Sequence, residues 1–170
     1  MKINRCRDAE TSGSLVADST GLAWHLETLE TTHVLGRQLV EQLPPGSILL
    51  LNGPLGAGKT SLVQGLAQGL GISEPITSPT FALAQHYTGG HPPLVHLDLY
   101  RLEHPAAADE LFLQEEEEAK ALNALMAVEW PERLSLSLPE AWSLVLEPLA
   151  SGGRQAQLIP PKETTSDSVG

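Results

Sequence analysis

A stretch of eight residues, GPLGAGKT at positions 53–60, constrains the fold more than any other part of the chain. It follows an apolar run at residues 48–51 and precedes a helical pattern from residue 59 to about residue 70. A buried strand, a glycine-rich turn and a helix N-terminus direct backbone N–H groups and the helix dipole at one point, which attracts phosphate. The pattern therefore predicts a strand–loop–helix unit that binds a nucleoside triphosphate.

Within this loop, Lys59 is expected to reach the β- and γ-phosphates and the Thr60 hydroxyl to bind Mg²⁺. Pro54, at the second position, has no backbone N–H, but the donors from residue 56 to residue 60 remain. Phosphate binding is therefore expected to survive the proline. The predicted ATP-binding residues of this segment are Gly53, Gly56, Ala57, Gly58, Lys59, Thr60 and Ser61.

A phosphate loop also needs a carboxylate at the end of a neighbouring strand, to hold Mg²⁺ directly or through water. Asp98 follows the apolar residues 94–97, and Glu129 follows residues 125–128. Both are candidate metal ligands and catalytic groups together with Lys59, and the sequence leaves open which of them contacts Mg²⁺ directly. Trp130, next to Glu129, can stack on a purine ring or simply pack.

Two further residues near these motifs have open roles. Thr80 lies in the segment TSPTF at residues 77–81, where NTPases often place a switch that senses the γ-phosphate, although a plain turn into a strand is an equal alternative. His96 is interpreted as structural, pointing away from the neighbours of Asp98.

Alternating strand and helix patterns predict the fold class: an α/β, P-loop NTPase-like three-layer sandwich with a mixed, mostly parallel central sheet and antiparallel C-terminal strands. A helix capped by Thr28 or Thr31 is expected to precede the loop, and the run Glu115–Glu118 is interpreted as a solvated helix face. Predicted strands cover residues 22–26, 48–52, 81–87, 94–97, 125–129, 143–147 and 155–159, and a third helix covers 105–120. The expected limits are a flexible arm at 1–20, an ATPase domain at 21–159 and a disordered tail at 160–170.

Composition limits the partners. The net charge is −11 and the chain has only ten Lys and Arg residues, so direct binding of nucleic acid is not expected. A single cysteine, no signal-peptide pattern and no membrane-spanning run predict a cytoplasmic protein that does not enter a membrane.

The scarcity of arginine bears on the reaction. Apart from Lys59, the only Lys or Arg residues between positions 59 and 148 are Arg101, Lys120 and Arg133, and Arg101 is expected to pair with an acid such as Glu103. Kinases acting on anionic acceptors use several arginines, and no arginine finger is evident in the chain. A slow, partner-dependent ATPase or a nucleotide switch is favoured; a small-molecule kinase and a non-catalytic, nucleotide-gated binding module remain alternatives.

The ordered set GPLGAGKT, TSPTF, HLDLYRL and VEWPERL resembles the bacterial TsaE family over residues 26–154. The resemblance implies an ATPase required for N6-threonylcarbamoyladenosine formation in tRNA, which acts on a TsaB–TsaD heterodimer, resets it between turnovers and meets tRNA only through it. It implies that Asp98 is essential for ATP hydrolysis, that Glu129 is the carboxylate near Mg²⁺, that Trp130 lies against the adenine and that Thr80 belongs to a switch.

The sequence departs from the family pattern at Pro54, where an acidic residue is usual. It departs again after residues 109–111, where Phe112-Leu113-Gln114 and four glutamates follow, and at its short, polar C-terminal end.

Overall fold

A seven-stranded sheet forms the middle layer of the structure, a computed structural model that describes residues 15, 17–79 and 81–163. The strands lie in the order β1-β7-β6-β2-β5-β4-β3. Their bounds are β1 (Ala23–Leu26), β2 (Ile48–Asn52), β3 (Ala84–Tyr87), β4 (Leu94–Asp98), β5 (Leu125–Glu129), β6 (Trp142–Pro148) and β7 (Arg154–Ile159).

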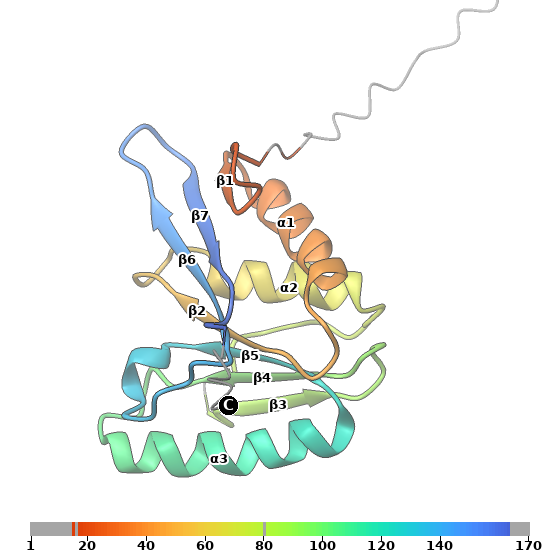
Figure 1. Cartoon of the computed structure of the whole chain (residues 1–170), viewed down its shortest axis with the longest axis vertical. Helices are drawn as coiled ribbons and strands as arrows, with labels where there is room; N and C mark the ends of the chain where they lie inside the picture. Colours follow the sequence, from red (N-terminus) through yellow and green to blue (C-terminus); the bar gives the residue numbers. More distant parts are fainter. Residues whose placement is uncertain (1–14, 16, 80, 164–170) are drawn as a thin grey trace, which may run out of the picture.

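The centre of the sheet is parallel and its edges are antiparallel. Strands β4, β5, β2 and β6 pair in parallel, whereas β3, β7 and β1 pair antiparallel with their neighbours. Every residue of β5 is buried, as expected for a central strand covered on both faces. The hairpin of β6 and β7 turns steeply away from β3–β5 (Figure 1). The predicted fold class is confirmed.

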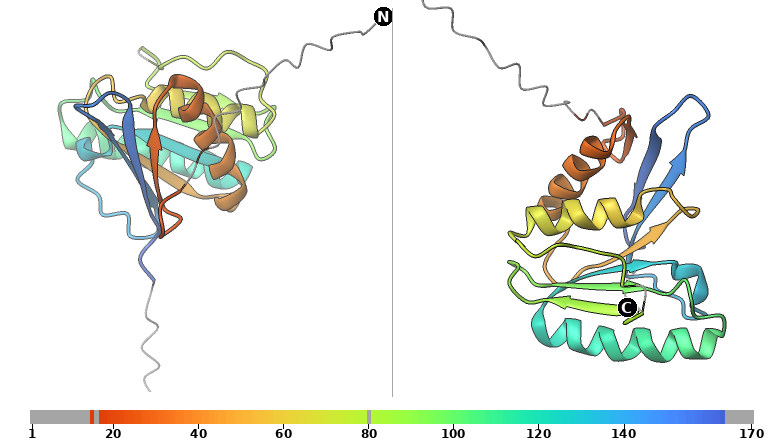
Figure 2. Two further views of the ribbon diagram at one scale, coloured as in Figure 1. Left: turned by 90° about the horizontal axis from the view of Figure 1, so that it is seen from above. Right: turned by 180° about the vertical axis from the view of Figure 1, so that it is seen from behind.

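Helices cover both faces of the sheet. Helices α1 (Leu29–Gln42) and α2 (Lys59–Gly69) lie on one face, and α3 (Pro105–Leu122) lies on the other, as Figures 1 and 2 show. Alternation along β2 divides its side chains between two cores: Leu49 and Leu51 pack on the side of α1 and α2, and Ile48 and Leu50 on the side of α3.

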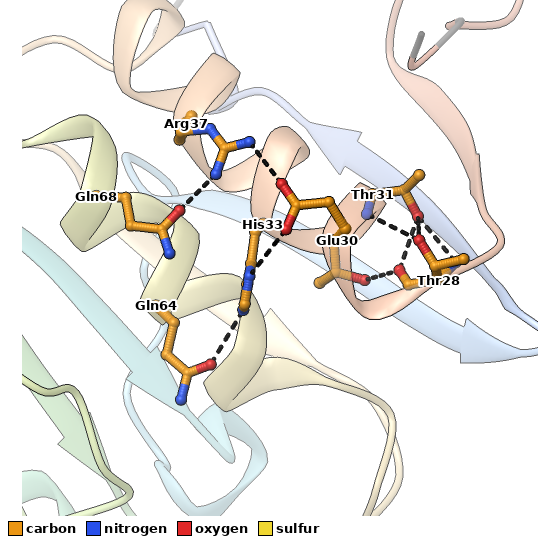
Figure 3. Close-up of polar contacts among 8 residues, drawn as sticks. Thr28, Glu30, Thr31, His33, Arg37, Gln64 and Gln68 are labelled. Atoms are coloured by element: carbon orange, nitrogen blue, oxygen red, sulfur yellow. Dashed lines mark hydrogen bonds and ion pairs between the residues drawn. The ribbon is translucent and has the colours of Figure 1, made fainter. Parts of the chain in front are cut away.

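Helices α1 and α2 pack backbone to backbone through glycines. A Cβ atom added at Gly65 would come within 2.5 Å of the His33 carbonyl oxygen, and one at Gly36 within 2.6 Å of the Leu66 nitrogen. Polar pairs join the same two helices: His33 bonds Gln64 at 3.1 Å, and Arg37 donates to Gln68 (Figure 3).

Both candidate caps take part at the start of α1. The Thr28 hydroxyl accepts the Thr31 backbone N–H at 3.2 Å, and the Thr31 hydroxyl accepts the Thr28 backbone N–H at 3.0 Å. Thr28 is the N-cap, and Thr31 completes a capping box with it.

One strand begins later than predicted. Residues 81–83 were expected in β3, but Leu83 has a left-handed backbone (φ 61°) and its N–H donates to the Pro79 carbonyl at 2.9 Å. This turn leaves Phe81 89% exposed, so pairing with β4 starts only at Ala84.

The prediction of a solvated face for Glu115–Glu118 is wrong for its first member. Glu115 is buried and forms an ion pair with His86 of β3, so it joins α3 to the edge of the sheet. Glu116 pairs with Lys120, while Glu117 and Glu118 are exposed.

Two contacts lie outside the predicted limits of the domain. Ala17 forms a β-bridge with Trp24, and the Lys162 N–H donates to the Pro139 carbonyl at 3.0 Å. Thr80, residues 1–14 of the predicted arm and residues 164–170 of the predicted tail lie outside the described residues. In the part of the chain that the structure describes, no helix combines the length and the apolar character needed to cross a membrane.

Candidate nucleotide-binding site

A pocket of about 420 Å³ opens where β2, β4 and β5 end and α2 begins. It lies at the carboxyl ends of parallel strands, where open α/β sheets bind their ligands. Nine residues predicted from the sequence line it: Gly56, Ala57, Gly58, Lys59, Thr60, Ser61, Asp98, Glu129 and Trp130. Gly53 does not line the pocket, but it contacts Lys59 directly.

The loop from Gly53 to Thr60 has the conformation that its glycines allow. Gly58 is the N-cap of α2 and has a left-handed backbone (φ 99°), which favours glycine. A Cβ atom at Gly53 would meet the Leu146 carbonyl oxygen of β6 at 2.5 Å. Pro54 takes part through its carbonyl, which accepts the Ala57 N–H at 3.1 Å. Its missing N–H therefore does not disturb the turn.

Lys59 lines this pocket and is buried. Its Nζ donates to the Gly53 carbonyl at 2.6 Å and lies 3.5 Å from the centroid of the Trp130 ring. Burial lowers the pKa of Lys59 from its ordinary value of 10.5, although the nearby carboxylates of Glu129, Glu132 and Asp98 act in the opposite direction.

Thr60 and Glu129 present oxygen atoms to each other across the pocket. The Thr60 Oγ1 lies 3.3 Å from each carboxylate oxygen of Glu129. A hydroxyl and a carboxylate are hard ligands of the kind that Mg²⁺ takes beside phosphates and water. Among the described residues, no group of three or more His, Cys, Asp and Glu side chains could hold a metal by itself. The hydroxyl and the carboxylate fit Mg²⁺ where other oxygen ligands complete its shell.

Asp98 is the parallel cross-strand neighbour of Glu129, and its carboxylate organises the adjoining loops. Its Oδ2 accepts the Ser78 hydroxyl at 2.9 Å, and its Oδ1 accepts the Tyr100 backbone N–H at 3.0 Å. Ser78 belongs to the segment that contains Thr80, so Asp98 connects the predicted switch to the pocket. Of the two candidate carboxylates, Glu129 is the one that contacts Thr60.

His96 does not point away from these groups as the sequence suggested. Residues two apart in a strand share one face, so His96 and Asp98 lie on the same side of β4. The His96 Nε2 lies 2.6 Å from the Glu129 Oε2, and the ring is fully buried. The sequence alone gave no signal for this contact, because it joins two strands whose register was unknown.

Trp130 has a left-handed backbone (φ 57°), an unusual conformation for a bulky residue that is often found at functional sites. Its ring contacts Lys59 on one side and lies 4.8 Å from the Tyr100 ring. Stacking of Trp130 on adenine stays a prediction.

Two arginines, Arg101 and Arg154, line the pocket, although the sequence made no arginine finger evident. Arg101 lies over the exposed Phe81 ring, at 5.0 Å from its centroid, and does not form the expected pair with Glu103. Arg154 donates from Nη2 to the Gly56 carbonyl at 3.4 Å. Arg154 stands just before the predicted strand at residues 155–159, far along the chain from the loop. Antiparallel pairing of the last two strands would have returned Arg154 to the loop.

A parallel sheet, a glycine-rich loop entering a helix, and a lysine, threonine and carboxylate gathered there define the class of P-loop α/β proteins. Residues 26–156 match the family described as threonylcarbamoyl adenosine biosynthesis protein TsaE. The chain therefore belongs to the TsaE family, whose role is in the biosynthesis of tRNA threonylcarbamoyladenosine.

Relatives and a solved structure agree with this assignment. The chain is 46% identical over 141 residues to the TsaE protein of Nostoc sp., covering 82% of this chain and 86% of that one. It is 48% identical over 118 residues to the TsaE protein of Synechocystis sp., covering 69% and 74%. The crystal structure of Bacillus subtilis YdiB superposes with a TM-score of 0.66 at 28% identity, over 83% of this chain and 86% of that one.

Proposed function

We propose that this protein binds ATP with Mg²⁺ in the pocket beside α2 and hydrolyses it slowly. The observation that carries the proposal is the meeting of Lys59, Thr60 and Glu129 at the start of α2, with the Thr60 hydroxyl 3.3 Å from both Glu129 oxygens. A lysine, a hydroxyl and a carboxylate at a helix N-terminus are what a nucleoside triphosphate with its metal requires.

Each residue has a defined task in this proposal. The backbone N–H groups of the loop and Lys59 hold the phosphates, and Thr60 and Glu129 hold Mg²⁺. The ion, when bound, neutralises charge on the phosphates. Asp98 orients the attacking water or belongs to the metal shell, and it holds the Ser78 segment in place.

The partner in this proposal is a TsaB–TsaD heterodimer in the cytoplasm. ATP binding or hydrolysis by this chain resets that complex between rounds of tRNA modification. Membership of the TsaE family supports this role. The net charge of −11 supports a chain that meets tRNA only through its partners.

The test is ATP hydrolysis by the purified chain alone, with TsaB–TsaD, and with TsaB–TsaD and tRNA. We expect slow phosphate release that accelerates with the partners; many turnovers per second by the chain alone would contradict partner dependence. Labelled ATP separates this function from a kinase, because a kinase leaves label on an acceptor.

Two variants test the roles of the residues. Lys59→Ala should abolish triphosphate binding, whereas Asp98→Ala should bind and fail to hydrolyse. Normal function of the Asp98→Ala variant in tRNA modification would favour a nucleotide-gated binding module without catalysis.

A further inference from the structure

We propose that Gln64 of α2 is a positioning residue for ATP hydrolysis: its amide ties the segment of residues 76–79 to α2, and that segment holds the Asp98 carboxylate. The proposal rests on the proposed function, because it assigns a further residue to the same reaction. Gln64 does not line the nucleotide pocket. It therefore acts through the segment and Asp98, and not by contact with the nucleotide.

The segment of residues 76–79 forms one side of the pocket without the support of regular structure. These four residues belong to neither a helix nor a strand, and Ser78 and Pro79 line the pocket. The Ser78 hydroxyl donates to the Asp98 Oδ2 at 2.9 Å. Backbone outside helices and strands relies on hydrogen bonds to side chains and loops to satisfy its polar groups and keep one position. The attachments of this segment therefore determine where the Ser78 hydroxyl meets Asp98.

Gln64 attaches the first residue of this segment to α2. Its Nε2 donates to the Ile76 carbonyl at 3.2 Å. The Ile76 side chain is buried in the core that contains the buried residues of α2, so the hydrogen bond adds a polar attachment to an apolar one. Gln64 lies about one helical turn after Thr60, which contacts Glu129. Helix α2 thus contacts Glu129 through Thr60 and reaches Asp98 through Gln64 and the segment.

Only one orientation of the Gln64 amide fits both of its neighbours. The Ile76 carbonyl can only accept, so the amide nitrogen faces it and the amide oxygen faces His33 of α1. The His33 Nε2 lies 3.1 Å from this oxygen and therefore carries the hydrogen (Figure 3). Both bonds are partly buried, where a hydrogen bond is stronger than in water. His33 thus holds the amide in the orientation that the Ile76 carbonyl requires.

The next turn of α2 has the same bond to α1 but no bond to the segment. Gln68 accepts a hydrogen bond from Arg37 of α1, as Gln64 does from His33 (Figure 3). Gln68 is exposed, and among the described residues it forms no hydrogen bond with the segment of residues 76–79. The two glutamines therefore separate the packing of α1 on α2 from the attachment of the segment.

The experiment compares Gln64→Glu with the matched control Gln68→Glu. Glutamate has the shape of glutamine and keeps an acceptor for α1, but it has no N–H to donate and turns a carboxylate oxygen toward the Ile76 carbonyl. The control adds the same charge beside Arg37, away from the segment. A third variant, Gln64→Leu, removes the amide without adding charge.

Four measurements separate positioning from binding and from folding. Calorimetric titration with Mg·ATP gives the affinity, and phosphate release at saturating Mg·ATP with TsaB–TsaD gives kcat. Hydrogen exchange of peptides that cover residues 76–79 reports on the attachment of the segment, and thermal unfolding reports on the fold.

We expect both Gln64 variants to lower kcat by about three- to ten-fold, the rate equivalent of one net hydrogen bond, and to exchange faster over residues 76–79. Their affinity for Mg·ATP should stay within about two-fold of the wild type, because the loop, Lys59, Thr60 and Glu129 are unchanged. Gln68→Glu should match the wild type in kcat, affinity and exchange.

A wild-type kcat in both Gln64 variants, or a lower kcat with unchanged exchange over residues 76–79, would overturn the positioning role and leave the proposed function standing. A loss of affinity as large as the loss of kcat would also overturn it. So would an equal loss of kcat in Gln68→Glu or a lowered Tm in all three variants, because the glutamines would then act through the packing of α1 on α2. If the wild-type chain bound no Mg·ATP or released no phosphate, the proposed function would fail, and this inference with it.

Discussion

At the scale of single residues, the contact between His96 and Glu129 adds most to the sequence motifs. Both side chains are buried, and the Glu129 carboxylate meets the imidazole Nε2 on one side and the Thr60 hydroxyl on the other. A hydrogen bond from the imidazole fixes the orientation of the carboxylate, as outer partners of metal ligands commonly do. His96 is thus a positioning residue for Glu129.

Replacing His96 should therefore change the Mg²⁺ requirement of nucleotide binding. In His96→Leu the carboxylate loses its donor, and we expect ATP binding to need about 10- to 100-fold more Mg²⁺. His96→Gln keeps an N–H donor on a shorter side chain and should restore much of the affinity. Titrations of ATP binding against Mg²⁺ measure both. If the two variants needed the same Mg²⁺ concentration as the wild type, His96 would be a packing residue only.

The sequence indicated a candidate site residue wherever a local pattern of neighbouring residues marked it. The loop residues, Asp98 and Glu129 were predicted because each follows the end of an apolar run, and the structure brings them to one pocket. The contacts of His96 and Arg154 depend on strand pairing across 33 and 98 positions of the chain, which no local pattern reveals.

At the scale of elements, the start of α2 depends on how closely α1 packs against it. Gly65 lies where the helices cross, and a Cβ atom there would meet backbone atoms of His33 at 2.5–3.0 Å. Backbone atoms cannot swing aside as the end of a side chain can. The packing of these helices therefore fixes the position of Lys59 and Thr60, in the first turn of α2.

Gly65→Ala should destabilise the protein in spite of the higher helix propensity of alanine. The propensity gain is about 1 kcal/mol, and overpacking against α1 costs typically 1–3 kcal/mol, so we expect a net loss of up to about 2 kcal/mol. Urea unfolding measures it. The control is Gly89→Ala, where the nearest atom to a new Cβ would be a Glu74 side-chain oxygen at 4.0 Å, and which should change little. An equal effect at both positions would contradict the packing argument.

The attachment of α3 to the loop after β5 should depend on pH. Asp109 accepts the Ser135 hydroxyl, and its Oδ1 accepts the Ser135 backbone N–H at 2.9 Å. The hydrogen bond from the Ser135 side chain lowers the pKa of Asp109 from its ordinary value of 3.8. A carboxyl whose pKa is lower in the folded state stabilises the fold while it is ionised. Its contribution is present above pH 3.8 and is lost as the pH falls through the lowered pKa.

Asp109→Asn should therefore be less stable than the wild type at neutral pH, with a difference that shrinks in acid below about pH 4. Chemical unfolding at a series of pH values measures this difference. Ser135→Ala should remove the same pH-dependent part. If the difference in the free energy of unfolding between wild type and variant stayed constant into acid, the hydrogen bonds from Ser135 would not stabilise the ionised Asp109 carboxylate.

Elements were easier to predict than their limits. The predicted bounds of β2 and β5 agree with those observed, because each strand is a short apolar run with polar or turn-forming residues on both sides. The failure at residues 81–83 came from an apolar phenylalanine and leucine that lie in a turn. The failure at Glu115 came from a histidine on β3 that reaches α3 only in the folded chain.

At the scale of the whole molecule, the pocket is lined by residues from the loop after β2, the ends of β4 and β5, and the start of β7. A ligand that contacts all of these segments binds only the folded chain. Nucleotide binding should therefore stabilise the entire domain by mass action.

Mg·ATP at about 100 times its dissociation constant should stabilise the fold by about 2.7 kcal/mol, which for a chain of this length raises the Tm by roughly 5–10 °C. Thermal unfolding with and without Mg·ATP measures the shift. Chelation of Mg²⁺ should remove most of it, and adenosine, which lacks phosphates, should produce none. A Tm shift of equal size with adenosine would contradict this expectation, because the binding energy would then come from contacts with the nucleoside and not from contacts between the phosphates and the loop.

The fold class could be predicted because alternating strands and helices indicate a parallel sheet whatever their order. The strand order could not, since β1 joins the sheet through β7, the last strand of the chain. Figure 2 shows the start and the end of the domain side by side at this edge.

The pairing of β1 with β7 also bears on how the protein is made. During translation the glycine-rich loop emerges early, but residues 23–26 find their partners only when residues 154–157 have left the ribosome. The same late event delivers Arg154 to the loop. A chain cut short before its final hairpin would carry the whole GPLGAGKT motif and still leave β1 unpaired and the wall of the site incomplete.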